Sequence, residues 1–268
     1  MSRTRGAWNT KGTWIAGVAL AAVLALTGYA ALSGDDSAPA GSGKDAGPSA
    51  GAGPSRQPAP APTYTVPKDW TDPQRWASLP RGARTDERGS AVGFPHTFEG
   101  AVAMLTAVNK IAVGDGKTSA DEQMRIYNSY VNKPDQSGAN ADMVRQNAQE
   151  TDKQLAQEMG GPGSKTLPAG AYMRTSVVGF KVLTRSDDEV CVWVLTRGVQ
   201  RNGETAKESA GYSRRVVAAQ WVDGDWKMTA AASSRAQQAV QGKSEPAMVA
   251  PGDQAFNEAG WTAIREAS

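Results

Sequence analysis

The sequence predicts an α+β protein. It predicts one exported cone-like domain of about three helices on a curved antiparallel sheet, preceded by a transmembrane helix and a disordered linker. Three observations lead to this prediction. An uncharged apolar run near the N-terminus is followed by a stretch rich in Pro, Gly, Ala and Ser. Segments with the apolar period of a helix come next, and segments with a period of two follow them. Helices followed by a meander of strands are typical of an α+β domain.

Residues 14–32 are an uncharged apolar run that is long enough to be a transmembrane helix. As a helix they extend about 28 Å, close to the thickness of the hydrocarbon core of a bilayer. Three basic residues precede the run, so the positive-inside rule predicts a cytoplasmic tail over residues 1–13 and export of everything after the helix. We therefore expect a single-pass protein of the cell membrane with an extracytoplasmic C-terminal domain. A cleaved signal peptide that ends near Ser33 is the alternative.

Residues 33–63 are expected to be a disordered linker. Between positions 34 and 63, Ala, Gly, Pro and Ser fill 23 of 30 places, and no aromatic residue occurs. Such a composition cannot bury enough apolar surface to offset the entropy lost on ordering. The segment therefore predicts a tether that holds the exported domain away from the membrane, and a neutral spacer without that role is the alternative.

The exported part begins with residues 64–89, in which Trp70 and Trp76 lie among prolines. We interpret this segment as a strap that packs against the domain, and an aromatic patch for a partner is the alternative. Residues 90–235 are predicted to form the cone-like domain, and residues 236–268 a tail with a short helix.

Three helices are predicted in the first half of the domain from the spacing of apolar residues. They span residues 98–113, 119–132 and 139–159. The first follows Thr97, a good N-cap, and the second opens with Ser119 and Glu122 spaced as in a capping box. The third ends at a run of glycines and a proline.

Four strands are predicted after the helices, over residues 173–184, 189–199, 212–222 and 225–231. Asp223-Gly224 favours a tight hairpin between the last two. The segment 189–199 is apolar on both faces, which is typical of a central strand that is covered on both sides. Helices are expected to cover one face. For the other face we favour the strap or the tail with Phe256 and Trp261, and a second copy in a weak homodimer is the alternative.

The candidate interaction residues are the tryptophans of the exported part, because tryptophan is enriched in the contacts that dominate protein–protein binding. They are Trp70, Trp76, Trp193, Trp221, Trp226 and Trp261. After residue 63 the basic and acidic side chains balance at 24 each, whereas a nucleic-acid-binding domain normally carries a net positive surface. We therefore expect protein partners and no direct contact with nucleic acid.

The residue types that carry most enzyme chemistry are scarce in this sequence. The one cysteine, Cys191, lies in an apolar run, and the one histidine, His96, precedes the predicted cap of the first helix. We interpret Cys191 as buried packing and His96 as part of helix initiation. Residues 114–118 end in Gly-Lys-Thr, but they lack the first glycine of a phosphate-binding loop and follow a predicted helix instead of a strand. We expect no catalytic residue, no cofactor and no metal site.

The order of the segments resembles that of the nuclear-transport-factor-2-like cone over residues 90–235. Four stretches, WASLPRGAR, GFPHTFEGAV, the GDW turn and AFNEAGW, resemble those of an actinobacterial family of uncharacterised single-pass membrane proteins. In layout these are similar to the scaffold proteins of type IV secretion and Gram-positive conjugation machines. The resemblance implies a membrane-anchored scaffold or assembly protein of a cell-envelope machine, with other machine proteins as partners.

The main alternative is an exported ligand-binding or enzymatic cone domain. Cone-shaped enzymes use a carboxylate or a histidine inside the cone, with a tyrosine that donates to an oxyanion. In this sequence the side chains for such a site are those of Glu99, Tyr127, Tyr130 and Tyr172. A wall-facing protein of regulatory type is a third hypothesis.

Overall fold

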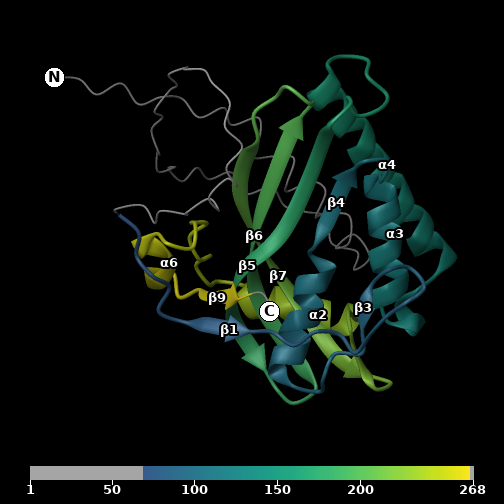
Figure 1. The fold of residues 1–268 in the computed structure, drawn as a ribbon. Helices are drawn as coiled ribbons and strands as arrows, with labels where there is room; N and C mark the ends of the chain where they lie inside the picture. Colours follow the sequence, from purple (N-terminus) through teal and green to yellow (C-terminus); the bar gives the residue numbers. More distant parts are fainter. Residues whose placement is uncertain (1–68, 266–268) are drawn as a thin grey trace, which may run out of the picture.

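The computed structural model describes residues 69–265 (Figure 1). In chain order the elements are β1 (Trp76–Ser78), β2 (Arg84–Thr85), β3 (Ala91–Val92), α2 (Phe98–Val108), β4 (Ile111–Gly114), α3 (Ser119–Tyr130), the 3₁₀ helix η3 (Lys133–Asp135), α4 (Gly138–Gly160), β5 (Ala171–Arg185), β6 (Glu189–Asn202), β7 (Ser209–Val222), β8 (Asp225–Lys227), α5 (Ala230–Val240), α6 (Gln254–Glu258) and β9 (Thr262–Arg265). The chain is therefore α+β, as predicted.

The predicted cytoplasmic tail, transmembrane helix and linker lie outside the described residues. Within residues 69–265, no helix combines the length and the apolar character that crossing a membrane requires. The same part of the chain holds five α-helices, where the sequence predicted about three. The two additional helices, α5 and α6, follow the strands.

A seven-stranded sheet organises the fold, in the order β1-β9-β5-β6-β7-β8, with β4 paired to β5 as well. Two strands pair with different parts of the long strand β5. Strand β4 pairs with Tyr172 to Thr175, and β9 pairs with Gly179 and Phe180. These pairs are antiparallel, but β1 runs parallel to β9. The sheet is therefore mixed, and the prediction of an antiparallel sheet was wrong at this edge, because the strap adds a strand beside the last strand of the tail.

Helices cover both faces of this sheet. On one face α2, α3 and α4 lie together (Figure 1) and pack around Met104, Leu105 and Ile126, and we call this the first core. On the other face α5, α6 and the start of β9 form the second core, which includes Phe256 and Trp261. The described residues thus form three layers, with the sheet in the middle.

The central strand β6 is buried on both faces, as its sequence predicted. Its even-numbered side chains Val190, Val192 and Val194 lie in the first core, and its odd-numbered side chains Cys191, Trp193 and Leu195 lie in the second. All six are at most 5% exposed. The tail covers the face of the sheet that bears the second core. The sequence analysis had considered a second copy of the chain as an alternative cover for this face.

Helix α2 begins where predicted and ends early. The Thr97 side chain accepts a hydrogen bond from the Gly100 amide at 3.0 Å, as an N-cap does. The helix stops at Val108, and residues 111–114 form β4. Ile111 and Val113 are buried with a period of two against β5. A short apolar run fits the period of a helix and that of a strand equally well, so the sequence pattern could not show this change.

The capping box of helix α3 lies one residue earlier than predicted. Thr118 is the N-cap and Asp121 completes the box, in place of Ser119 and Glu122. The amide of Ser119 donates instead to the Asp152 carboxylate of α4. The third predicted helix is confirmed almost in full, since α4 spans Gly138–Gly160.

The strap and the tail both contribute strands to the main sheet. The predicted last strand, 225–231, ends at Lys227, because Thr229 caps α5 by accepting a hydrogen bond from the Ala232 amide. Helix α5 then runs past residue 235, the predicted end of the cone-like domain. Trp76 of β1 pairs with Ala263 of β9. The described parts of the strap and the tail are therefore built into the same fold as the central segments.

Replacing Trp261 with Ala is expected to lower the free energy of unfolding of residues 64–268 by about 3–5 kcal/mol, because a fully buried tryptophan leaves a cavity. Urea unfolding followed by circular dichroism measures the change. The matched control is Trp76→Ala, at a side chain that is 42% exposed, for which we expect less than about 1 kcal/mol. Equal losses for the two variants would show that the tail does not stabilise the second core.

Candidate functional site

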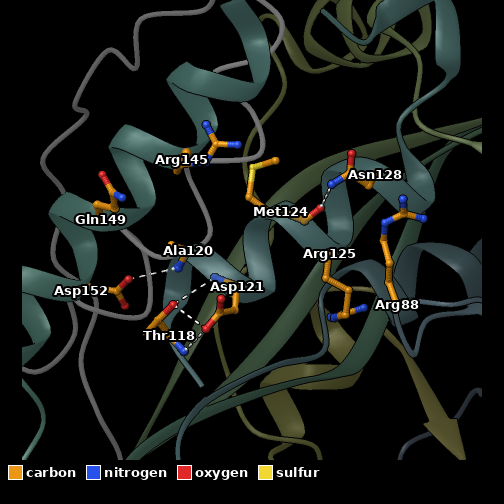
Figure 2. A pocket seen from close by; sticks show the side chains of 10 residues that line it. All are labelled: Arg88, Thr118, Ala120, Asp121, Met124, Arg125, Asn128, Arg145, Gln149 and Asp152. Carbon is orange, nitrogen blue, oxygen red and sulfur yellow. Dashed lines mark hydrogen bonds between the residues drawn. The ribbon is translucent and has the colours of Figure 1, made fainter. Parts of the chain in front are cut away.

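A surface cleft lies between α3 and α4. Its volume is about 630 Å³, and its lining comes from the β2–β3 turn, from α3 between its N-cap and Asn128, and from the middle of α4 (Figure 2). The charged side chains of this cleft are Arg88, Asp121, Arg125, Arg145 and Asp152. Met124 supplies an apolar surface, and the Asn128 and Gln149 side chains supply amides.

The two carboxylates of the cleft, Asp121 and Asp152, accept hydrogen bonds from groups at the start of α3. Asp152 accepts hydrogen bonds from the amides of Ser119 at 2.6 Å and Ala120 at 3.1 Å. These amides have no partner within the helix, and the positive end of the helix dipole favours a carboxylate there. Burial nevertheless raises the pKa of Asp152, against the effect of the two amides. The Asp121 carboxylate accepts from the amide and hydroxyl of Thr118, which lowers its pKa.

Two of the three arginines are also held in place. The Arg125 guanidinium donates to Glu122 at 2.8 Å and to the Ser90 hydroxyl at 2.8 Å. Arg145 donates to Asp142 at 2.7 Å, one turn earlier in α4. The Arg125 pair is largely buried, whereas the pair of Arg145 with Asp142 is exposed.

Three of the six candidate interaction tryptophans are buried within the chain. Trp193 and Trp261 lie in the second core, and Trp226 lies in the first. The indole of Trp226 donates to the Pro95 carbonyl, and that of Trp261 to the Ala247 carbonyl, each at 2.8 Å. Buried indoles need such partners. These three tryptophans stabilise the fold and present no surface of their own.

The other three tryptophans differ in exposure. Trp221 is half-buried and contacts Trp226 edge to face. Trp70 is half-buried against the tail, and its indole donates to Asp72. Trp76 is the exposed one, with the Arg265 guanidinium 4.8 Å from its ring centre. The structure does not bring the six tryptophans into one patch, so the partner surface they suggested is reduced to the region around Trp76.

His96 connects the start of α2 with the sheet. Its ring stacks on Trp221 at 4.1 Å, and its Nε2 lies 3.1 Å from the Asp187 carbonyl and 2.9 Å from the Asp188 carboxylate. Both partners are acceptors, so Nε2 carries a proton. These contacts join the segment before α2 to the β5–β6 turn and to Trp221 of β7.

The remaining sequence motifs are also accounted for by the fold. Cys191 is buried in the second core, which confirms its predicted packing role. Burial raises the pKa of its thiol to about 11. Residues 114–118 begin at the last residue of β4, a strand, where the sequence analysis expected a helix. They form a tight turn in which Gly114 and Lys117 exchange backbone hydrogen bonds. Within residues 69–265, no group of three or more His, Cys, Asp and Glu side chains is arranged to hold a metal ion.

The four side chains named for an enzymatic cone do not converge. Tyr127 is buried and donates to the Ser137 carbonyl, whereas Tyr130 is buried elsewhere and donates to the Ala91 carbonyl. Glu99 is exposed. Tyr172 lies on the opposite face of the sheet, where it donates to Glu208.

Sequence reasoning missed the cleft. Its side chains come from three elements, and the signal in the sequence was the long polar surface of α4, which carries Arg145, Gln149 and Asp152 at helical spacing. Comparison with known proteins adds no relative: no protein-family model, no curated protein and no solved structure matches this chain.

Replacing Asp121 with Ala is expected to lower the free energy of unfolding by about 1 kcal/mol at neutral pH, because the Thr118 amide loses its carboxylate acceptor in the capping box. The pKa of Asp121 is lowered from 3.8 in the folded chain, so this stabilisation is present above that value and is lost as the pH falls through the folded pKa. Urea unfolding at neutral and strongly acidic pH measures both effects. The control Asp142→Ala, in an exposed ion pair, is expected to change stability by less than about 0.5 kcal/mol. A pH-independent difference would contradict the assignment.

Replacing His96 with Ala is expected to lower the free energy of unfolding by about 1 kcal/mol, since a stacked pair contributes roughly 0.5–1.5 kcal/mol. Complementation of a strain that lacks the protein should be retained. The matched variant His96→Phe keeps a ring on Trp221 and should recover part of the stability. Lost complementation with an unchanged melting curve would instead indicate a catalytic histidine.

Proposed function

We propose that the protein is a membrane-anchored scaffold or assembly protein of a cell-envelope machine, of the conjugative DNA transfer or type IV secretion kind. In this proposal residues 14–32 span the cell membrane once, the N-terminus is cytoplasmic and the described domain is extracytoplasmic. The observation that carries the proposal is the way the strap is fixed to the tail. An anchored scaffold needs a defined point at which the chain from the membrane enters its folded domain.

The described part of the strap is held by several contacts with the tail. The Thr71 amide donates to the Gly252 carbonyl at 2.7 Å, and the Gln74 amide donates to the Asn257 side chain at 2.9 Å. Strand β1 then pairs with β9. These contacts hold residues 71–78 beside the tail, at the β1–β9 edge of the sheet, which supports a domain that a chain from the membrane enters at one fixed edge.

A binding role is further supported by the chemistry of the cleft. Its two carboxylates cap α3, and Arg125 and Arg145 are paired within the chain. Groups committed in this way are poor general acids and bases. The alternative, an exported ligand-binding domain, is favoured by the same cleft, because its volume of about 630 Å³ lies in the range of small-molecule sites.

Deleting the protein from a cell that carries a conjugative element is expected to lower the transfer frequency. The full chain should restore transfer. The exported part, released from the membrane by replacing residues 1–32 with a cleaved export signal, should not restore it, because a scaffold acts at the membrane. A strain without the protein that transfers normally would overturn the proposal. Restoration by the released domain would instead favour the ligand-binding or enzymatic alternative.

A further inference from the structure

The sheet carries a row of arginines on the face that bears the second core. Paired residues of antiparallel strands point to the same face. Arg197 and Arg201 of β6 share a face with Leu195 of the second core, and Arg174 of β5 pairs with Val199, midway between the two β6 arginines. Arg197, Arg174 and Arg201 therefore follow one another at two-residue steps of about 7 Å along the strands. We call these three residues the arginine row.

The row lies beyond the segments that cover the second core. The tail and α5 pack near Cys191 to Leu195. Further along, β5 and β6 project past α6 and β9 (Figure 1). On this part of the face Arg174 is exposed, with 60% of its side chain accessible, and Arg197 and Arg201 are half-buried. A band of basic side chains thus remains accessible next to a covered apolar core.

Tyrosines support the row. The guanidinium carbons of Arg174 and Arg201 lie 4.5 and 4.9 Å from the centre of the Tyr172 ring, distances at which cation–π attraction operates. Arg197 pairs across the strands with Tyr212. Burial raises the pKa of Tyr212, and the nearby Arg197 guanidinium opposes that rise. Each arginine of the row therefore has an aromatic neighbour that limits its freedom.

The acidic side chains near the row come from loops at its rim. Asp115 lies 4.0 Å from Arg174, and Glu208 accepts from the Tyr172 hydroxyl at 2.5 Å. Arg214 of β7 extends the row by one step and forms an ion pair with Glu245. Arg215 belongs to the other face, where it donates to the Asn109 side chain and burial lowers its pKa to about 10. No acidic residue lies within the row itself.

We propose that this face binds single-stranded nucleic acid along the arginine row. A repeating chain of phosphates matches a linear series of guanidinium groups, which bind phosphate in a planar, bidentate manner. Arginine planes supported by aromatic rings also offer a surface on which bases can stack. An acidic protein segment offers carboxylates but no stacking bases, so the combination of a row with aromatic support favours nucleic acid.

This inference departs from the sequence-based expectation of no direct contact with nucleic acid. That expectation used the charge balance of the whole exported part, whereas the register of β5 and β6 gathers basic side chains in one place. The inference extends the proposed function, since an exported domain in DNA transfer would meet the transferred strand. It stands on the geometry of the face alone, and a binding measurement in solution can fail or succeed independently of the transfer assay.

The test is fluorescence anisotropy with the full chain in detergent and a labelled oligothymidylate of about 20 nucleotides, several site lengths for such surfaces. The triple variant R174Q/R197Q/R201Q should weaken binding at least about tenfold, and the slope of log K against log salt should fall by about 2. The single variant Arg174→Gln, at an exposed side chain, should lower the slope by about 0.7. Unchanged binding in the triple variant, or an unchanged slope in a folded Arg174→Gln variant, would overturn the proposal.

Two controls separate this site from general charge attraction. The variant R88Q/R145Q/R235Q removes the same charge from the cleft and from α5, and it should bind within about twofold of wild type. The variant R174K/R197K/R201K keeps the charge of the row, and it should lose the preference for oligothymidylate over a glycerol-phosphate polymer of equal length. The proposal is wrong if that polymer, or polyglutamate, competes with the wild-type chain as well as unlabelled oligothymidylate does.

Discussion

The two-sided burial of β6 is the constraint on which the rest of the fold depends. Val192 and Val194 face the first core, while Trp193 and Leu195 face the second. Each buried Å² of apolar surface contributes about 25 cal/mol, so a strand that is apolar on both faces needs cover on both. Helices α2, α3 and α4 supply one layer. Helices α5 and α6, together with the start of β9, supply the layer on the other face. Because α6 and β9 belong to the tail, the tail is part of the fold.

The return of the tail also determines where the two ends of the described chain lie. Gly179 allows the Phe256 ring to approach β5, since a Cβ at that position would stand 3.1 Å from the ring. Gly252, at a positive φ of 104°, lies directly against the Trp70 ring and leaves no room for a side chain. Two glycines thus permit the contacts by which the tail closes over the sheet and the strap closes over the tail.

Charge is used in two different ways on the two sides of the molecule. In the cleft, the Asp121 and Asp152 carboxylates hold the start of α3. Arg125 and Arg145 form ion pairs with Glu122 and Asp142 of their own helices. Along the arginine row, the side chains are supported by tyrosines and their acidic neighbours stay at the rim. Equal numbers of basic and acidic residues are therefore compatible with a local basic surface, because the two kinds of side chain gather in different regions of the domain.

The sequence by itself determined the features that rest on near neighbours: the Thr97 cap, helix α4, the hairpin at Asp223-Gly224 and the two apolar faces of β6. Each depends on residues within one or two turns or strand steps, whose preferences act locally. Only the tertiary structure decided that residues 111–114 form a strand, that the tail supplies the second layer, and that arginines 23–27 positions apart share one face. These outcomes depend on pairing between distant segments, and a single sequence holds no local signal for the register of such pairs.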